Sequence, residues 1–347
     1  MKPIVICPIV GFLVAVVATK AAIALAERKH LYDAPGPLKI HRKPIPRLGG
    51  VGIASGLLIA ALPWLTTSPK NVVMAGLLLL VIWALGLADD LRSLPALFRL
   101  TLQLGVGVGL GLAGWQLRFT SIYLIDLSIT ACVFALFVNS MNLLDGMDGL
   151  ATGTAAIAGA GFVILAPINS TVALFALCLL GTCLGTLVFN LPPARIFIGD
   201  SGSTLLGALL FFLTVDLTHP SSGSQPATLG FLILAVPLID AMFAVVRRIL
   251  GGGSPLSGDR LHFYDILLAK GLSVRRVLLI SYALGGVLVL LSALCGRGTL
   301  KLGTTGLVVL AVLVAAGFLL GSYAPQVDES AAPRTVAALR EKPTAEI

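Results

Sequence analysis

The sequence predicts an all-α fold, a polytopic integral membrane bundle of about 10–11 transmembrane helices. Of the 347 residues, 57% are hydrophobic and only 12% are charged, and the mean hydropathy is +1.00. Soluble domains carry about 25% charged residues. The composition therefore excludes an ordinary soluble domain. It also excludes a disordered chain, which needs low hydrophobicity and high charge.

Apolar runs that approach the length needed to cross a bilayer, about 20 residues, recur along the chain. The first run follows Lys2 as in a signal peptide, but it is too long for a typical signal sequence and further runs follow directly. We therefore expect a retained first helix. The candidate spans are 4–25, 48–65, 72–87, 100–114, 127–143, 151–166, 171–189, 203–217, 227–250, 277–295 and 302–323.

Lys and Arg residues are divided unequally between the two sets of loops. Of the 24, 18 fall in one set together with the C-terminal segment, and five fall in the other set. The positive-inside rule places the richer set in the cytoplasm. We expect a multi-pass inner (plasma) membrane protein, with a membrane domain over 1–323 and a flexible cytoplasmic tail over 324–347. No basic patch stands outside the membrane, which argues against nucleic acid as a partner.

Acidic residues gather at the cytoplasmic ends of the predicted spans. In the run GLADDLRSL, Asp89 and Asp90 end the third span side by side. Adjacent carboxylates repel each other unless a cation lies beside them, and oxygen ligands of this kind suit Mg²⁺. A solvated helix end is the alternative interpretation.

The run NSMNLLDGMDGLA places Asn139, Asn142, Asp145 and Asp148 at intervals of three. Unsatisfied amides are costly inside an apolar run, so the two Asn either hydrogen-bond between helices or meet a ligand. Hydrogen bonding between helices does not explain the two Asp. We expect this segment to face a substrate.

A second proline- and glycine-rich run, NLPPARIFIGDSGS, begins at Asn190 and places Asp200 where the eighth span opens. A glycine-rich turn at a helix N-terminus offers backbone N–H groups to phosphate, but Asp200 also fits a simple helix cap. Upstream, HRKPIPRLGG holds Lys43 and Arg47, which indicate either an anion site or positive-inside charge.

The longest loop motif, SPLSGDRLHFYDILLAKG, contains Arg260 and His262. A lone loop His is ordinarily an exposed residue. Asp240 lies in the middle of the ninth span, and hydrogen bonding inside the bundle is favoured over contact with a substrate.

Taken in order, these five motifs resemble the polyprenyl-phosphate N-acetylhexosamine-1-phosphate transferases, a superfamily that includes phospho-MurNAc-pentapeptide translocase. The resemblance covers residues from about 33 to 276. It implies an active site at the cytoplasmic face. There a HexNAc-1-phosphate, expected to be GlcNAc-1-phosphate, moves from a UDP-HexNAc to a polyprenyl phosphate, and UMP leaves. The acceptor is undecaprenyl phosphate if the source is bacterial. The implied cofactor is Mg²⁺, with Mn²⁺ as an alternative.

The resemblance also assigns roles by motif position. It implies Asp200 as the metal ligand, and Asp89 and Asp90 as residues that position or deprotonate the lipid phosphate. Catalytic roles extend to Asp145 and His262. The remaining positions are implied to bind substrate: Lys43, Arg47, Asn139, Asn142, Asp148, Asn190, Phe197 and Arg260.

One stretch departs from the family pattern. Glycan-initiating members usually carry His-x-His-His in the last loop, whereas this chain has His262-Phe263-Tyr264-Asp265. The aromatic pair favours stacking on a compact sugar ring, which favours UDP-GlcNAc over UDP-MurNAc-pentapeptide. Two alternative functions stay open: the translocase itself and, as a different class of function, a membrane transporter. The sequence also leaves open the lipid length, the pathway, a one- or two-step mechanism and a homodimer.

Overall fold

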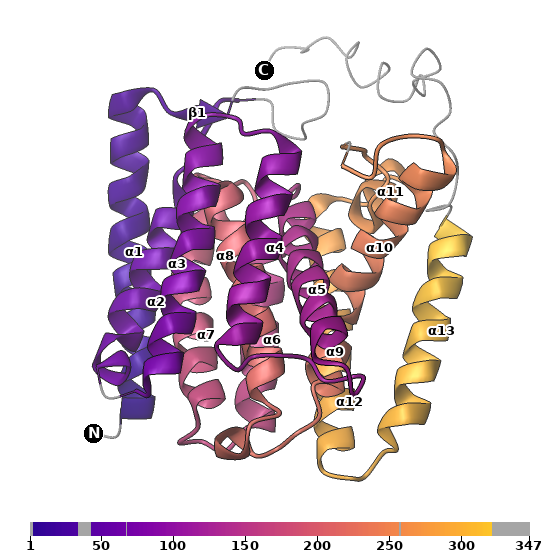
Figure 1. Ribbon diagram of the computed structural model, residues 1–347. Coiled ribbons are helices and arrows are strands. Elements are labelled where there is room, and N and C mark those ends of the chain that lie inside the picture. The colour runs from indigo at the N-terminus through magenta and orange to yellow at the C-terminus, as the bar shows by residue number, and fades with distance from the viewer. Residues whose placement is uncertain (1–2, 34–42, 67, 257, 321–347) are drawn as a thin grey trace.

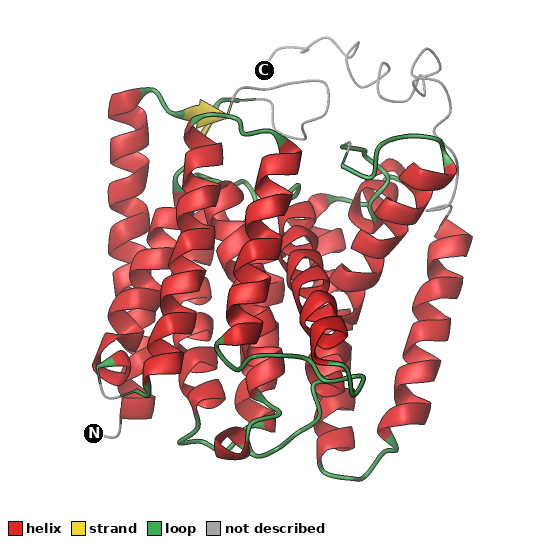
Figure 2. Ribbon diagram, in the orientation of Figure 1, coloured by secondary structure: helices red, strands yellow, loops and turns green. Residues whose placement is uncertain are grey.

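The computed structural model describes residues 3–33, 43–66, 68–256 and 258–320. Long helices run side by side across one bundle (Figures 1 and 2), which confirms the predicted polytopic helical membrane fold. Within the described residues, 5 helices are long and apolar enough to cross a membrane, and shorter apolar helices accompany them. The predicted tail over 324–347 lies outside the described residues.

The first half of the bundle follows the predicted spans closely. A two-residue antiparallel pairing links β1 (Tyr32–Asp33) to β2 (Ile45–Pro46), and it was not predicted. The helices of this half are α1 (Pro3–Lys29), α2 (Gly49–Leu65), α3 (Lys70–Leu91), α4 (Ala96–Leu112), α5 (Tyr123–Leu144) and α6 (Leu150–Leu165).

The second half contains the helix that lies at the centre of the bundle. Every residue of α8 (Gly199–Asp216) except Asp200 is buried, and this helix packs against α2, α3 and α5. The remaining elements are α7 (Thr171–Asn190), η1 (Pro220–Ser222), α9 (Thr228–Ile233), α10 (Ala235–Leu250), α11 (Phe263–Ala269), α12 (Val274–Gly296) and α13 (Leu302–Leu320).

The predicted ninth span, 227–250, is divided into two helices. α9 ends at Ile233 and α10 begins at Ala235. Pro237 lies in the first turn of α10, and it has no N–H to offer the carbonyl of Ile233. Its ring also clashes with a carbonyl four residues back, so the chain changes direction here.

Close backbone packing joins α3 to α8 beneath the acidic end of the bundle. A Cβ atom on Gly86 would lie 2.5 Å from the carbonyl oxygen of Asp200. Only a glycine allows the two backbones to approach this closely. Asp89 and Asp90 follow within one helical turn, so this contact brings them to the first turn of α8.

Candidate active site

Asp90 caps the N-terminus of α8 from another helix. Its Oδ1 accepts the N–H of Asp200 at 2.8 Å, and its Oδ2 accepts the N–H and the hydroxyl of Ser201 at 3.0 and 2.6 Å. A helix N-terminus presents unpaired N–H groups that favour a carboxylate. Asp90 therefore fixes the position of Asp200.

The turn before α8 is shaped around this carboxylate. Gly199 has a φ of +66°, and a Cβ there would lie 2.5 Å from Oδ1 of Asp90. A side chain at this position is excluded both by the left-handed backbone and by the lack of space. The glycine therefore belongs to the capping arrangement.

Asp89 and Asp200 face each other across the end of the bundle, and Arg99 lies against both. Asp89 accepts the N–H of Leu94 at 2.6 Å and a guanidinium N–H of Arg99 at 2.5 Å. The same nitrogen of Arg99 lies 3.5 Å from Oδ2 of Asp200, so one guanidinium joins the two carboxyl groups. The sequence interpretation missed Arg99, because it counted this residue only as loop charge.

Asp145 adds a further carboxyl group to this cluster. It follows the last turn of α5, and the N–H of Gly199 is hydrogen-bonded to it. Burial raises the pKa of Asp145 well above its usual range, and the nearby charges of Asp200, Asp90 and Asp148 raise it further. A site with this many carboxyl groups and few cations is suited to a cation.

The residues present fit a magnesium ion whose remaining ligands come from the substrate phosphates. Among the described residues, no group of three or more His, Cys, Asp or Glu is arranged to hold a metal by itself. Mg²⁺ is usually bound by one or two carboxylates together with waters and phosphates. Asp200 and Asp89, whose carboxyl groups share the guanidinium of Arg99, supply a donor set of this kind.

The predicted asparagines of α5 lie on the wall beside this cluster. Asn142 accepts a hydrogen bond from the Ser203 hydroxyl at 2.9 Å. Asn139 donates to Gln103 on α4 at 2.7 Å and to the carbonyl of Ala135. Both amides thus form hydrogen bonds between helices, which is one of the two interpretations that the sequence offered for them. Asn142 also borders the first turn of α8.

Asn190 and Asp148 hold the connection between α7 and α8. Asn190 is buried, accepts from the Thr152 hydroxyl at 2.9 Å and donates to the Ile196 carbonyl at 3.0 Å. Asp148 accepts the N–H of Ala194 at 2.9 Å. These contacts shape the loop that leads to Asp200.

The first loop, which carries the predicted residues Lys43 and Arg47, lies beside the connection between α7 and α8. The Phe197 N–H donates to the Pro46 carbonyl, and its own carbonyl accepts the N–H of Gly49, both at 2.9 Å. Arg47 pairs with Asp33 at 3.3 Å and lies close enough to act on the charge of Asp90. Lys43 is exposed on the same loop.

His262 belongs to a separate, buried cluster. Its Nδ1 lies 2.7 Å from Asp240 and its Nε2 lies 3.4 Å from Asp259. Asp240 also accepts the N–H of Phe263 at 2.9 Å, so its role is hydrogen bonding within the bundle. His262 is only 3% exposed, and among the described residues it makes no hydrogen bond or ion pair with Asp89, Asp200 or their cluster. Its catalytic role stays a prediction.

Two arginines of α10 complete the His262 cluster. Arg247 lies 2.7 Å and Arg248 lies 3.2 Å from the same oxygen of Asp259. Burial alone would raise the pKa of Asp259, but the hydrogen bonds from these guanidinium groups lower it below its usual range. The cluster therefore ties the last loop to α10 with charged hydrogen bonds.

Tyr264 connects this loop to the end of α5. Its hydroxyl donates to the Leu143 carbonyl at 3.0 Å, beside the segment that carries Asn142 and Asp145. Its ring stacks on His262 and is 2% exposed. The expectation that the aromatic pair stacks on the sugar is therefore wrong for Tyr264, because its ring is already packed between protein groups.

The structure brings together Asp89, Asp90, Asp145 and Asp200 at one end of the bundle, as the motifs predicted. Arg260 pairs with Asp265 at 3.1 Å in the last loop. The fold and this site define a polytopic membrane protein with a cluster of acidic side chains between helix ends.

Comparison with known proteins identifies the class more closely. Residues 72–218 match the glycosyl transferase family 4. A probable undecaprenyl-phosphate N-acetylglucosaminyl 1-phosphate transferase of Bacillus subtilis is 30% identical over 82% of this chain and 83% of its own length. The decaprenyl-phosphate N-acetylglucosaminephosphotransferase of Mycolicibacterium smegmatis is 32% identical over 81% of this chain and 80% of its length.

A more distant relative carries a similar name. The undecaprenyl-phosphate alpha-N-acetylglucosaminyl 1-phosphate transferase of Escherichia coli K12 is 25% identical over 73% of each chain. The chain belongs to the polyprenyl-phosphate N-acetylhexosamine-1-phosphate transferase family.

Proposed function

We propose that this protein transfers GlcNAc-1-phosphate from UDP-GlcNAc to a membrane polyprenyl phosphate, releasing UMP, at the cytoplasmic face and with Mg²⁺ as cofactor. The observation that carries the proposal is the meeting of Asp89, Asp200 and Asp145 beside Arg99 at one end of a membrane bundle. The names of the relatives support the sugar and the lipid class.

The position of the site suits this pair of substrates. A lipid phosphate stays at the membrane surface, and a nucleotide sugar arrives from water. Both are anions, so their approach needs positive charge and preorganised hydrogen-bond donors. Arg99 supplies a guanidinium at the cluster, and the loop with Arg47 lies next to the first turn of α8.

The reaction is a phosphoryl transfer without a requirement for a strong base. A phosphate monoester has a second pKa near 6, so the acceptor is mostly dianionic at neutral pH. One of its oxygens attacks the sugar-linked phosphorus of the donor. A new P–O bond forms, the bond to the bridging oxygen breaks, and UMP leaves with that oxygen and its electron pair.

Asp200 and Asp89 are the residues we assign to Mg²⁺, which supplies charge neutralisation on the pyrophosphate when bound. Asp90 keeps Asp200 in place through its contacts with the first turn of α8. Asn142 and Asp145 border the same turn, through Ser203 and Gly199, and we assign them to the donor.

A transporter is the weaker alternative. Carriers place ionisable residues near the membrane midplane, commonly at broken helices. The bundle does contain a broken helix, at α9 and α10, but Asp240 on α10 is hydrogen-bonded to His262 and Phe263. The acidic cluster instead lies at the helix ends.

The test is an assay of UMP release by the purified full-length protein with undecaprenyl phosphate and a panel of UDP-sugars. We expect turnover with UDP-GlcNAc that depends on Mg²⁺ or Mn²⁺ and stops in EDTA. Asp200→Asn should lower kcat by about 100-fold or more, because metal charge stabilisation is worth several kcal/mol and each 1.36 kcal/mol is tenfold.

A matched control is Asp126→Asn, the same change at the opposite end of α5. Asp126 accepts hydrogen bonds from Phe119 and Thr120 of its own loop, so we expect near-normal turnover by the folded protein. Full activity of Asp200→Asn, or full activity in EDTA, would overturn the metal assignment.

A further inference from the structure

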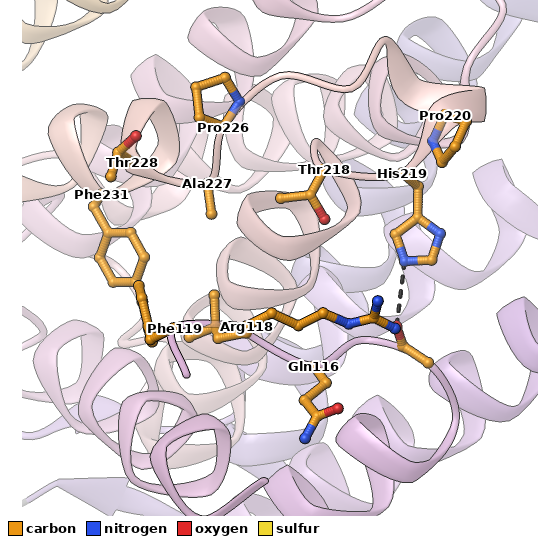
Figure 3. A pocket seen from close by; sticks show the side chains of 12 residues that line it. Gln116, Arg118, Phe119, Thr218, His219, Pro220, Pro226, Ala227, Thr228 and Phe231 are labelled. Atoms are coloured by element: carbon orange, nitrogen blue, oxygen red, sulfur yellow. Dashed lines mark hydrogen bonds between the residues drawn. The ribbon is translucent and has the colours of Figure 1, made fainter. Parts of the chain in front are cut away.

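A second cavity lies at the end of the bundle opposite the acidic site. It has a volume of about 680 Å³ and is lined by the loop after α4, the end of α8 and the start of α9. Figure 3 shows Arg118 extending across this cavity toward His219, with Phe119 and Phe231 on the other side. The catalytic proposal uses none of these residues.

A buried polar cluster supports His219, one of the residues that line the cavity. Asp216, at the end of α8, is buried and accepts hydrogen bonds from Trp115 Nε1 at 2.9 Å and from the Ser222 hydroxyl at 2.8 Å. His219 stacks on Trp115 with ring centroids 5.8 Å apart, and its Nε2 lies 3.3 Å from the Gly114 carbonyl. The buried groups satisfy one another, so the cavity is formed before any ligand arrives.

The charge of the cavity is positive. Arg118 supplies this charge, and among the described residues no Asp or Glu lines the cavity. Within the described part of the chain, Arg118 makes no ion pair closer than 4.0 Å. Asp126, in the first turn of α5, accepts the N–H groups of Phe119 and Thr120, and the charge of Arg118 acts on it without a direct ion pair. The guanidinium of Arg118 can therefore still take an anion as its direct partner.

The cavity continues into an apolar, membrane-facing groove. Thr228 and Phe231 line both spaces. The groove has a volume of about 580 Å³ and runs between α5, α9, α10 and α13, with walls that include Leu232, Met242 and Leu307. The exposed ring of Phe119 also lines the cavity, as aromatic residues do at a membrane interface.

We propose that this cavity binds the headgroup of an anionic phospholipid from the leaflet opposite the acidic site. Its phosphate lies on Arg118 and the edge of His219, and its acyl chains leave past Phe231 into the groove. A basic pocket between helix ends beside an apolar groove matches the two parts of such a lipid. The proposal does not depend on the transfer reaction, since an inactive protein can still bind the lipid.

The experiment is native mass spectrometry of the delipidated full-length protein titrated with phosphatidylglycerol. We expect one lipid to bind more tightly than the rest. Arg118→Gln should weaken that first site roughly tenfold or more, the size expected for a lost charge-assisted hydrogen bond. Arg118→Lys should retain part of the affinity.

Two matched variants separate this site from general adhesion. Arg297→Gln removes an exposed arginine at the same end of the bundle, outside the cavity, and it should bind as the wild type does. Ala227→Trp fills the cavity while keeping Arg118, and it should lose the tight site. Equal loss in Arg297→Gln, or wild-type binding by Ala227→Trp, would overturn the proposal.

Two ligands distinguish the source of the phosphate. Phosphatidylethanolamine should bind more weakly than phosphatidylglycerol, because it carries no net charge. Inorganic phosphate should not displace the bound lipid, because it gains nothing from the apolar groove. Displacement by millimolar inorganic phosphate, or equal binding of both lipids, would contradict an anionic phospholipid site.

Discussion

Asp90 Oδ1 lies 2.8 Å from the backbone nitrogen of Asp200, so two residues 110 positions apart form one helix cap. Its neighbour Asp89 instead contacts Arg99 and the N–H of Leu94. The adjacent carboxylates of Asp89 and Asp90 thus have different structural roles. Asp90 holds the first turn of α8, while Asp89 lies with Asp200 beside Arg99, where we propose that Mg²⁺ binds.

The first prediction concerns this cap. Asp90→Ala should destabilise the folded protein by about 0.5–2 kcal/mol, the usual cost of a lost N-cap, and lower kcat because Asp200 loses its position. Asp89→Ala should lower activity with a smaller change in thermal stability. Thermal unfolding and UMP release measured on both variants check this, and equal unfolding temperatures for the two would contradict the division of roles.

The second prediction concerns Arg99. Its guanidinium contacts Asp89 and approaches Asp200, and its side chain is 31% exposed. Arg99→Gln should reduce kcat/KM by about 10–100-fold, since it removes a charge-assisted contact worth about 1.5–3 kcal/mol. Arg99→Lys should recover part of the loss. Arg92→Gln, which alters the nearby arginine between α3 and α4, is the control and should leave kcat/KM within about threefold, as expected of a surface charge.

The sequence predicted those features of the site that depend on residues close together in the chain, and missed those that depend on contacts between distant helices. Hydropathy predicted the spans because the bilayer sets their length, and local motifs predicted Asp89, Asp145 and Asp200. The pairing of Asp90 with the α8 turn, and of Arg99 with both acids, joins separate helices. No spacing in the sequence indicates such contacts, so they emerged only from the packing.

The last loop illustrates the same limit. His262 stood out because the chain has only 4 His, yet its partners Asp240 and Asp259 bury it away from solvent. The signal that indicated this role was Asp240, an acid in the middle of an apolar span, which needs a polar partner. Sequence reasoning noted Asp240 and His262 but not that they pair.

The third prediction concerns pH. Burial raises the pKa of Asp265 above its ordinary value of 3.8, despite the opposing charge of Arg260. The fold therefore favours the protonated carboxyl. The contribution of the protonated Asp265 to stability is fully present below the ordinary pKa of 3.8 and is lost as the pH rises through the raised pKa of the folded protein. The unfolding temperature of the wild type relative to Asp265→Asn should fall as pH rises from about 4 toward neutrality. A difference that grows with pH would contradict the raised pKa.

The fourth prediction concerns topology. Because the sequence assigns 18 of the 24 basic residues to the set of loops and the C-terminal segment expected on the side of the acidic cluster, that side should be cytoplasmic and the N-terminus outside. Alkaline phosphatase fused after residue 298, in the turn between α12 and α13, should be active, whereas a fusion after residue 270 should be inactive. Green fluorescent protein should give the reverse pattern. An active phosphatase at residue 270 would place the acidic site outside.

The fifth prediction concerns the donor. UDP-MurNAc-pentapeptide carries carboxylates that need cations or hydrogen-bond donors near the last loop. Here the Tyr264 hydroxyl already donates its hydrogen bond to the Leu143 carbonyl, and Arg260 is paired with Asp265. Arg247 and Arg248 bind Asp259. The loop therefore offers little to a peptide donor.

We expect kcat/KM to be at least about 100-fold higher for UDP-GlcNAc than for UDP-MurNAc-pentapeptide, because a charged group left without partners costs several kcal/mol. Steady-state UMP release with each donor measures the ratio. Asp265→Asn, which frees Arg260, should narrow the preference, whereas Arg297→Gln at the opposite end should leave it unchanged. Efficient turnover of the peptide donor with none of UDP-GlcNAc would refute the choice of sugar, while the acidic site and its metal assignment would stand.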